Sequence, residues 1–214
     1  MTEWKRRPSG LAVPHHSASD WDFSCTWGLD NSIYVIPPAS LRVTTTNDAI
    51  ARLPVLCRKA DTLNLPQGRI ETQWRNSYTG YALNAIYFRQ QSTLGAFDTN
   101  NTYMFWVASD RCYAAKRVAG TPTTFGSFQY DSHAINTWYR ERWTWWKEAG
   151  ALAMRYEYWN GSQWVTVTPD IYDSSPSFEG SGTNRCGVGV NAMGGGGSQS
   201  HNLWFDSTLI EWPS

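Results

Sequence analysis

Residues 138–164 read WYRERWTWWKEAGALAMRYEYWNGSQW, and this stretch decides the fold. It holds six of the 13 tryptophans of the chain. Its aromatic runs are separated by turn signals at residues 147–150 and at Asn160-Gly161. Asn-Gly favours the positive φ angles that a type I′ hairpin turn requires. We therefore expect a three-stranded antiparallel meander here, around which the rest of the chain builds two sheets.

Successive side chains of a strand point to opposite faces, so the first run of this stretch has two different faces. One face carries Tyr139, Glu141, Trp143 and Trp145, and the other carries Trp138, Arg140, Arg142 and Trp146. Both faces hold aromatic residues, so one belongs to the core and the other lies at an interface or in a groove. The alternation alone leaves open which face is which.

The remainder of the chain is a series of short strand patterns separated by turns. We expect strands at residues 33–36, 40–46, 53–58, 69–75, 82–89, 102–108, 111–118, 123–130, 186–190 and 203–212, and a long loop at 169–183. Residues 69–75 and 82–89 are expected to pair as a hairpin. The pattern predicts an all-β fold, a two-sheet antiparallel jelly-roll sandwich at residues 21–214. Residues 1–20 are expected to form an irregular arm that contacts a neighbouring subunit.

Composition limits the partners of the protein. Lys+Arg and Asp+Glu are both 18, so the net charge is zero, and charged residues make up 17% of the chain. This disfavours nucleic acid as a partner, and the absence of a long apolar run disfavours membrane insertion. The four cysteines are widely spaced, without a Cys-x-x-Cys pair, which predicts buried thiols or, as the alternative, one long-range disulfide.

Three motifs in this order resemble the concanavalin A-like lectin/glucanase superfamily. The first is GRIETQWR at residues 68–75, followed by IYFR at 86–89; the second is NTWYRERW at 136–143, followed by NGSQW at 160–164; the third is GVGV at 187–190, followed by WFD at 204–206. The resemblance spans about two thirds of the chain and implies a jelly-roll sandwich. Proteins of this fold include lectins, glycan hydrolases, lyases and binding modules, so it does not decide the function.

The chain lacks the catalytic patterns of the enzymes in this superfamily. A retaining glucanase would carry Glu-x-Asp-x-x-Glu on one strand face, and no such run occurs. Arg69-x-Glu71-x-x-x-Arg75 is similar to the Arg/Glu/Arg strand of the lyases, but their Gln-x-His and Tyr-x-Lys strands are not found. His133 is expected in a loop without a partner, and Glu141 in a cross-strand ion pair beside its arginines. Binding is therefore favoured over catalysis, with a hydrolase or polysaccharide lyase as the alternative.

A glycan site needs aromatic rings for the apolar faces of sugars and polar side chains for their hydroxyl groups. The candidate polar residues are Glu71, Gln73, Arg75 and Arg89, and the candidate stacking residues are Tyr78, Trp106, Trp143 and Trp145. No cofactor is required by this chemistry. The resemblance implies a structural Ca²⁺ held by Asp206 together with Asp20 or Asp22.

The chain starts at Met1 without a secretory signal, although folds of this kind usually bind glycans outside cells. A phage or virus structural protein is made in the host cytoplasm and released by lysis, which would resolve that conflict. We therefore expect a virion component, on the capsid surface or in a tail or fibre, whose partners are neighbouring subunits or copies of itself and a cell-surface glycan. A cytoplasmic lectin is the alternative.

Overall fold

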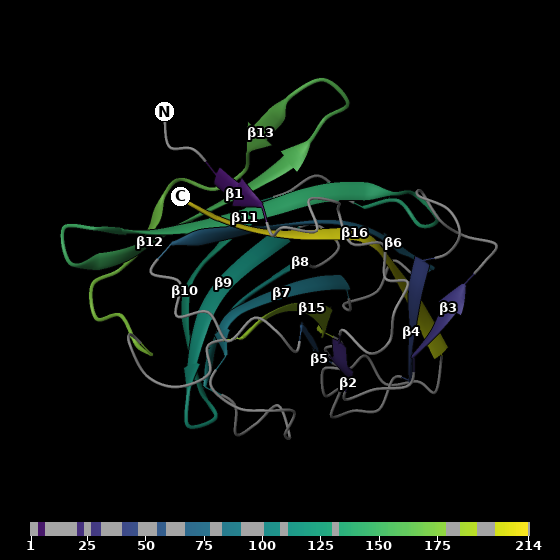
Figure 1. Ribbon diagram of the computed structural model, residues 1–214, viewed down its shortest axis with the longest axis horizontal. Coiled ribbons are helices and arrows are strands. Elements are labelled where there is room, and N and C mark those ends of the chain that lie inside the picture. Colours follow the sequence, from purple (N-terminus) through teal and green to yellow (C-terminus); the bar gives the residue numbers. More distant parts are fainter. Residues whose placement is uncertain are drawn as a thin grey trace.

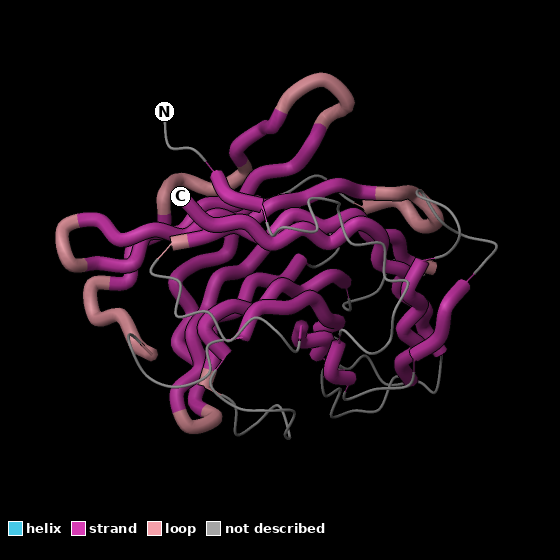
Figure 2. The backbone as a smooth tube through the Cα atoms, viewed as in Figure 1, coloured by secondary structure: helices cyan, strands magenta, loops and turns pink. Residues whose placement is uncertain are grey.

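The computed structural model of the protein describes residues 4–6, 21–23, 27–30, 40–46, 55–58, 67–77, 83–90, 101–107, 111–129, 133–178, 185–191 and 200–213. The regular structure of these residues consists of strands, which are arranged in two antiparallel sheets (Figure 1, Figure 2). In this part of the chain no helix is long and apolar enough to cross a membrane. The predicted all-β sandwich is confirmed.

The first sheet contains nine strands in the order β13-β12-β11-β6-β16-β4-β3, with β14 paired to β12 and β1 paired to β16. Their bounds are β1 Trp4–Arg6, β3 Trp27–Asp30, β4 Ser40–Thr46, β6 Gly68–Asn76, β11 Tyr139–Glu148, β12 Ala151–Trp159, β13 Trp164–Thr166, β14 Ile171–Asp173 and β16 Ser200–Pro213. The predicted meander is confirmed as β11, β12 and β13, which occupy consecutive places at one side of this sheet.

The second sheet contains seven strands in the order β10-β9-β8-β7-β15-β5-β2. Their bounds are β2 Trp21–Phe23, β5 Val55–Arg58, β7 Leu83–Gln90, β8 Thr102–Val107, β9 Arg111–Val118, β10 Thr121–Gln129 and β15 Arg185–Asn191. Figure 1 shows this sheet stacked against the sheet that holds β11, β6 and β16. The core lies between them, and its largest fully buried side chains include Trp74, Trp143, Trp145, Tyr103 and Tyr156.

Three strand predictions need correction. Residues 69–75 and 82–89 do not form a hairpin, because β6 pairs with β11 and β16 in one sheet while β7 pairs with β8 and β15 in the other. The predicted loop at 169–183 contains β14, whose Ile171 and Asp173 are buried. The N-terminal arm is not wholly irregular, since Trp4–Arg6 extends the nine-stranded sheet beside the end of β16. The expected strand at 33–36 lies outside the described residues.

The two turns of the meander differ from each other. Ala149 and Gly150 both have positive φ, 50° and 86°, as a two-residue type I′ hairpin between β11 and β12 requires. Asn160-Gly161 was expected to form such a turn, but only Gly161 has a positive φ, and the connection to β13 takes residues 160–163. The Asn160 carboxamide oxygen accepts hydrogen bonds from the backbone N–H groups of Ser162 and Gln163, which closes this longer loop.

One glycine sets the spacing of the core. Gly68 lies opposite Trp145 in the β6–β11 pairing, and a Cβ atom at residue 68 would come 2.6 Å from the indole ring.

Of the cysteines, Cys112 is free and buried in the core, and burial raises the pKa of its thiol to about 12. The side chains of the other three cysteines lie outside the described residues.

Candidate functional site

The outer face of the nine-stranded sheet combines exposed polar groups with aromatic rings. Along β6 the buried Ile70, Thr72 and Trp74 alternate with the half-buried Arg69, Glu71, Gln73 and Arg75. Strand β11 follows the same alternation, with Glu141, Trp143 and Trp145 buried and Arg140, Arg142 and Trp146 partly exposed. The structure thereby shows which face of β11 belongs to the core. Trp143 and Trp145 lie on the core side, and the arginines lie on the solvent side.

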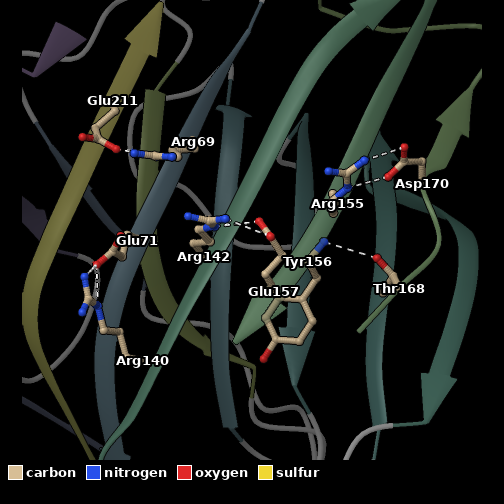
Figure 3. A network of polar contacts seen from close by, with 10 residues as sticks. All are labelled: Arg69, Glu71, Arg140, Arg142, Arg155, Tyr156, Glu157, Thr168, Asp170 and Glu211. Atoms are coloured by element: carbon tan, nitrogen blue, oxygen red, sulfur yellow. Dashed lines mark hydrogen bonds and ion pairs between the residues drawn. The ribbon is translucent and has the colours of Figure 1, made fainter. Parts of the chain in front are cut away.

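Four arginine–carboxylate pairs lie across this face in the described part of the chain, and Figure 3 shows them on neighbouring strands, except that Asp170 lies just before β14. Arg69 pairs with Glu211, and the Arg140 Nε atom donates to Glu71 Oε1 at 2.6 Å. Two pairs are bidentate: Arg142 donates to both oxygens of Glu157 at 2.6 and 2.9 Å, and Arg155 to both oxygens of Asp170 at 2.7 and 2.8 Å. Charge-assisted pairs of this geometry fix the orientation of the guanidinium groups.

Tryptophan rings pack against these arginines. The Arg142 guanidinium carbon lies 4.2 Å from the centroid of the Trp164 ring, and that of Arg140 lies 5.2 Å from Trp164 and 5.3 Å from Trp159. Trp159 and Trp164 meet edge to face, with centroids 5.6 Å apart, across the β12–β13 pair. A cation and the aromatic face beneath it attract each other, so the rings and the guanidinium groups hold one another in place.

We call this region the arginine–tryptophan face, and it consists of Glu71, Arg140, Arg142, Glu157, Trp159 and Trp164. The side chain of Arg140 is 40% exposed, and Trp159 and Trp164 are half-buried. The face thus presents aromatic surface beside hydrogen-bond donors and acceptors whose positions are fixed. This arrangement can bind a hydroxyl-rich ligand without rearranging.

The opposite side of β11 holds a different polar cluster inside the core. Glu141 is fully buried and accepts a hydrogen bond from the Asn84 side-chain amide at 3.0 Å. His133 Nε2 lies 3.3 Å from the other carboxylate oxygen, and its ring lies 4.9 Å from that of Trp74. His133 lies in a loop as expected, but the expected lack of a partner and the expected ion pair of Glu141 were wrong. His133 has a partner, and Glu141 is not paired with Arg140 or Arg142, because strand alternation points it to the other face.

A third cluster joins the two sheets at their edge. Tyr103 on β8 donates a 2.5 Å hydrogen bond to Asp173 on β14, and Lys116 on β9 donates to both oxygens of the same carboxylate. Burial and the bond to Asp173 raise the pKa of Tyr103 well above its usual value. Burial acts to raise the pKa of Asp173, but hydrogen bonds from Lys116, Tyr103 and Ser175 outweigh it, so the pKa lies below its usual value.

The residues predicted for a glycan site do not form one site. Glu71, Gln73 and Arg75 share the outer face of the nine-stranded sheet, where Arg75 donates to Asn136 and lies over Trp204. Trp143 and Trp145 are each 1% exposed in the core, so they are not available for stacking on a ligand.

The rest of the predicted set lies on or beyond the other sheet. Trp106 is on the seven-stranded sheet, where its ring stacks on Tyr113 with centroids 5.0 Å apart. Arg89 is buried and donates to the Ser177 carbonyl oxygen. Tyr78 lies outside the described residues.

The expected calcium site remains a prediction. Asp206 is buried on β16 of the nine-stranded sheet, whereas Asp22 belongs to β2 of the seven-stranded sheet, with its side chain outside the described residues. Asp20 also lies outside them. The residues that the structure describes include no group of three His, Cys, Asp or Glu side chains able to hold a metal ion.

No protein-family model and no curated protein match this sequence. Solved structures match its fold. The potassium-bound carbohydrate recognition domain of Emp46p aligns with 91% of this chain and 88% of its own, with a TM-score of 0.56 and 12% identity. The carbohydrate binding module CBM66 from Bacillus subtilis aligns over 90% and 95%, with a TM-score of 0.52 and 14% identity.

An engineered GH43 glycoside hydrolase covers all of this chain with 41% of its own length, at a TM-score of 0.55 and 12% identity. These neighbours are carbohydrate-binding or glycan-active proteins by name, and the likeness to them is one of fold.

Proposed function

We propose that this protein is a non-catalytic carbohydrate-binding β-sandwich module that binds glycan on the arginine–tryptophan face. The observation that carries the proposal is the Trp159–Trp164 pair beside Arg140 and Arg142. Aromatic rings offer large apolar surface to the C–H face of a sugar, while the neighbouring guanidinium and carboxylate groups meet its hydroxyl groups. The carbohydrate-binding names of two structural neighbours support the same function.

The carboxylates of this face favour binding over hydrolysis. Glycoside hydrolysis requires one carboxyl group to donate a proton and a second to act as base or nucleophile. Here Glu71 and Glu157 both accept hydrogen bonds from arginine, so both carboxyl groups are already engaged by the protein. We assign them to holding Arg140 and Arg142 in place.

Substitution of the two tryptophans tests the binding face. Trp159→Ala and Trp164→Ala are expected to weaken glycan binding at least about tenfold, since each removes a stacking ring. Affinity gel electrophoresis against a panel of soluble polysaccharides and calorimetry with the best ligand would measure this. Tyr172→Ala is the matched control, because Tyr172 is 50% exposed on β14, which pairs with the other half of β12. Unchanged binding in both tryptophan variants would overturn the proposal.

The finer proposal is that this module is a component of a phage or virus particle in contact with neighbouring subunits. The zero net charge and the 15% aromatic content support an assembling protein. Mass spectrometry of purified particles from lysed host cells tests this location. Recovery of the protein in the soluble lysate and not in particles would favour a cytoplasmic lectin.

A further inference from the structure

The charges of the outer sheet face are balanced pair by pair. Arg69, Arg140, Arg142 and Arg155 lie against Glu211, Glu71, Glu157 and Asp170, respectively. The hydrogen bond to Asp170 raises the pKa of Arg155 further above its usual value. The face therefore has strong local dipoles but no net charge among these eight groups.

This pairing decides which ligands the arginines can accept. Recognition of a carboxylate or sulfate group uses the planar fork of N–H donors on a guanidinium. In Arg142 that fork is already occupied by Glu157, and the Nε and Nη2 atoms of Arg140 both contact Glu71 Oε1. An acidic sugar on this face would have to displace Glu71 or Glu157 and would meet the like charge of that side chain, which is unfavourable.

A neutral sugar meets neither obstacle. Hydroxyl groups donate to carboxylate oxygens and accept from the remaining N–H groups, so they can bridge an existing arginine–carboxylate pair without breaking it. Gln73, directly opposite Arg140 in the β6–β11 pairing, adds a neutral amide on the same face. Arg75, whose side chain contacts Asn136 and Trp204, lies on β6 beyond this group, next to β16.

We propose that the arginine–tryptophan face selects neutral glycans and discriminates against acidic ones. The inference rests on the proposed function and adds the ligand class. The guanidinium groups act as fixed donors for hydroxyl groups, and the ion pairs between them keep uronate and sulfate groups out. Binding should depend on shape and hydrogen bonding and only weakly on ionic strength.

The test compares polysaccharides that share a backbone and differ mainly in the charge of their substituents. Suitable pairs are hydroxyethylcellulose with carboxymethylcellulose and methyl-esterified with de-esterified polygalacturonan. The wild-type protein is expected to bind the neutral member of at least one pair about tenfold or more tightly than its acidic partner. Raising the salt from about 0.05 M to about 0.5 M should change the neutral affinity less than about twofold.

Two substitutions, Glu71→Gln and Glu157→Gln, test whether binding of acidic polysaccharides can be increased. Each change leaves an arginine without its carboxylate and should raise the affinity for the acidic polysaccharide about tenfold relative to the affinity for its neutral partner. Asp170→Asn is the control, because Asp170 partners Arg155, which lies outside the arginine–tryptophan face. Trp164→Ala should abolish binding of either class.

The two proposals fail in different ways. If the wild-type protein binds the acidic members more tightly, and Trp164→Ala removes that binding, selection of neutral glycans is wrong and glycan binding at this face stands. If no polysaccharide binds, or if binding is indifferent to both tryptophans, the proposed function itself is wrong.

Discussion

The two sides of strand β11 place polar side chains in opposite environments. On the inner side Glu141 is fully buried between Asn84 and His133. On the outer side Arg142 and Glu157 form a bidentate pair whose side chains remain 18% and 11% exposed. A fully buried polar group that loses a partner destabilises the fold strongly, whereas an ion pair that stays partly exposed contributes less to stability. The inner cluster should therefore affect folding, and the outer pairs should affect recognition.

The largest expected effect comes from the tryptophans on the two sides. Trp143→Ala should lower the free energy of unfolding by about 3–5 kcal/mol, because a large side chain leaves a cavity in the core. Trp143 is 1% exposed and stacks on Tyr156 with centroids 4.0 Å apart. Urea denaturation followed by far-UV circular dichroism would measure the change. Trp164→Ala on β13, the outer counterpart, should lower stability by less than about 1 kcal/mol. Equal losses would show that the inner and outer assignment is wrong.

The second prediction concerns the buried carboxylate. His133→Ala leaves one oxygen of Glu141 without that contact and should destabilise the protein by about 2 kcal/mol. The double variant His133→Ala with Glu141→Gln removes the buried charge and should recover part of the loss. Thermal unfolding of the two variants at neutral pH provides the measurement. A double variant no more stable than His133→Ala would contradict this expectation.

The third prediction is a pH dependence at the edge of the two sheets. The pKa of Asp173 is lowered in the folded protein, so its ionised form stabilises the fold above the unfolded value of about 3.9. This contribution is lost as the pH falls through the folded pKa. Asp173→Asn should lower stability by about 1.5 kcal/mol at neutral pH, and the difference from wild type should shrink below about pH 4. A difference that stays constant down to pH 2 or so would contradict it.

Much of the fold could be predicted because strand patterns are local. The alternation at residues 69–75 and the aromatic runs around Ala149-Gly150 set the strands and one turn of the meander. Sheet membership could not be predicted in the same way. Consecutive strands usually pair, yet β7 is buried on both faces and belongs to the other sheet. No pattern within residues 82–89 indicates to which sheet the strand belongs.

The candidate site was predicted only in part. Glu71 and Gln73 were selected as polar candidates and share the outer, half-buried face of β6, but Trp143 and Trp145 were selected for their aromatic character and lie in the core. Arg140 and Arg142 could have identified the exposed face of the strand, because arginine is mostly exposed in folded proteins and both lie on one face. The partners Glu157 and Trp164 lie on strands that only the completed sheet brings together, so their contacts could not be read from spacing.

The smallest expected effect on stability is the one that most sharply separates the two sides of β11. A double-mutant cycle of Arg142→Ala and Glu157→Ala should give a coupling of about 0.5–1 kcal/mol, the range of partly exposed ion pairs. Binding should respond more strongly, because Arg142 lies 4.2 Å from the Trp164 ring and helps to hold that ring in position. Calorimetry should therefore show Arg142→Ala weakening glycan binding by more than its effect on folding accounts for. The same cycle at Arg155 and Asp170 is the control, since this pair contacts neither Trp159 nor Trp164 in the described structure. If both cycles change stability and binding alike, the outer pairs are ordinary surface ion pairs, and the separation of folding and recognition between the two sides of the strand is lost.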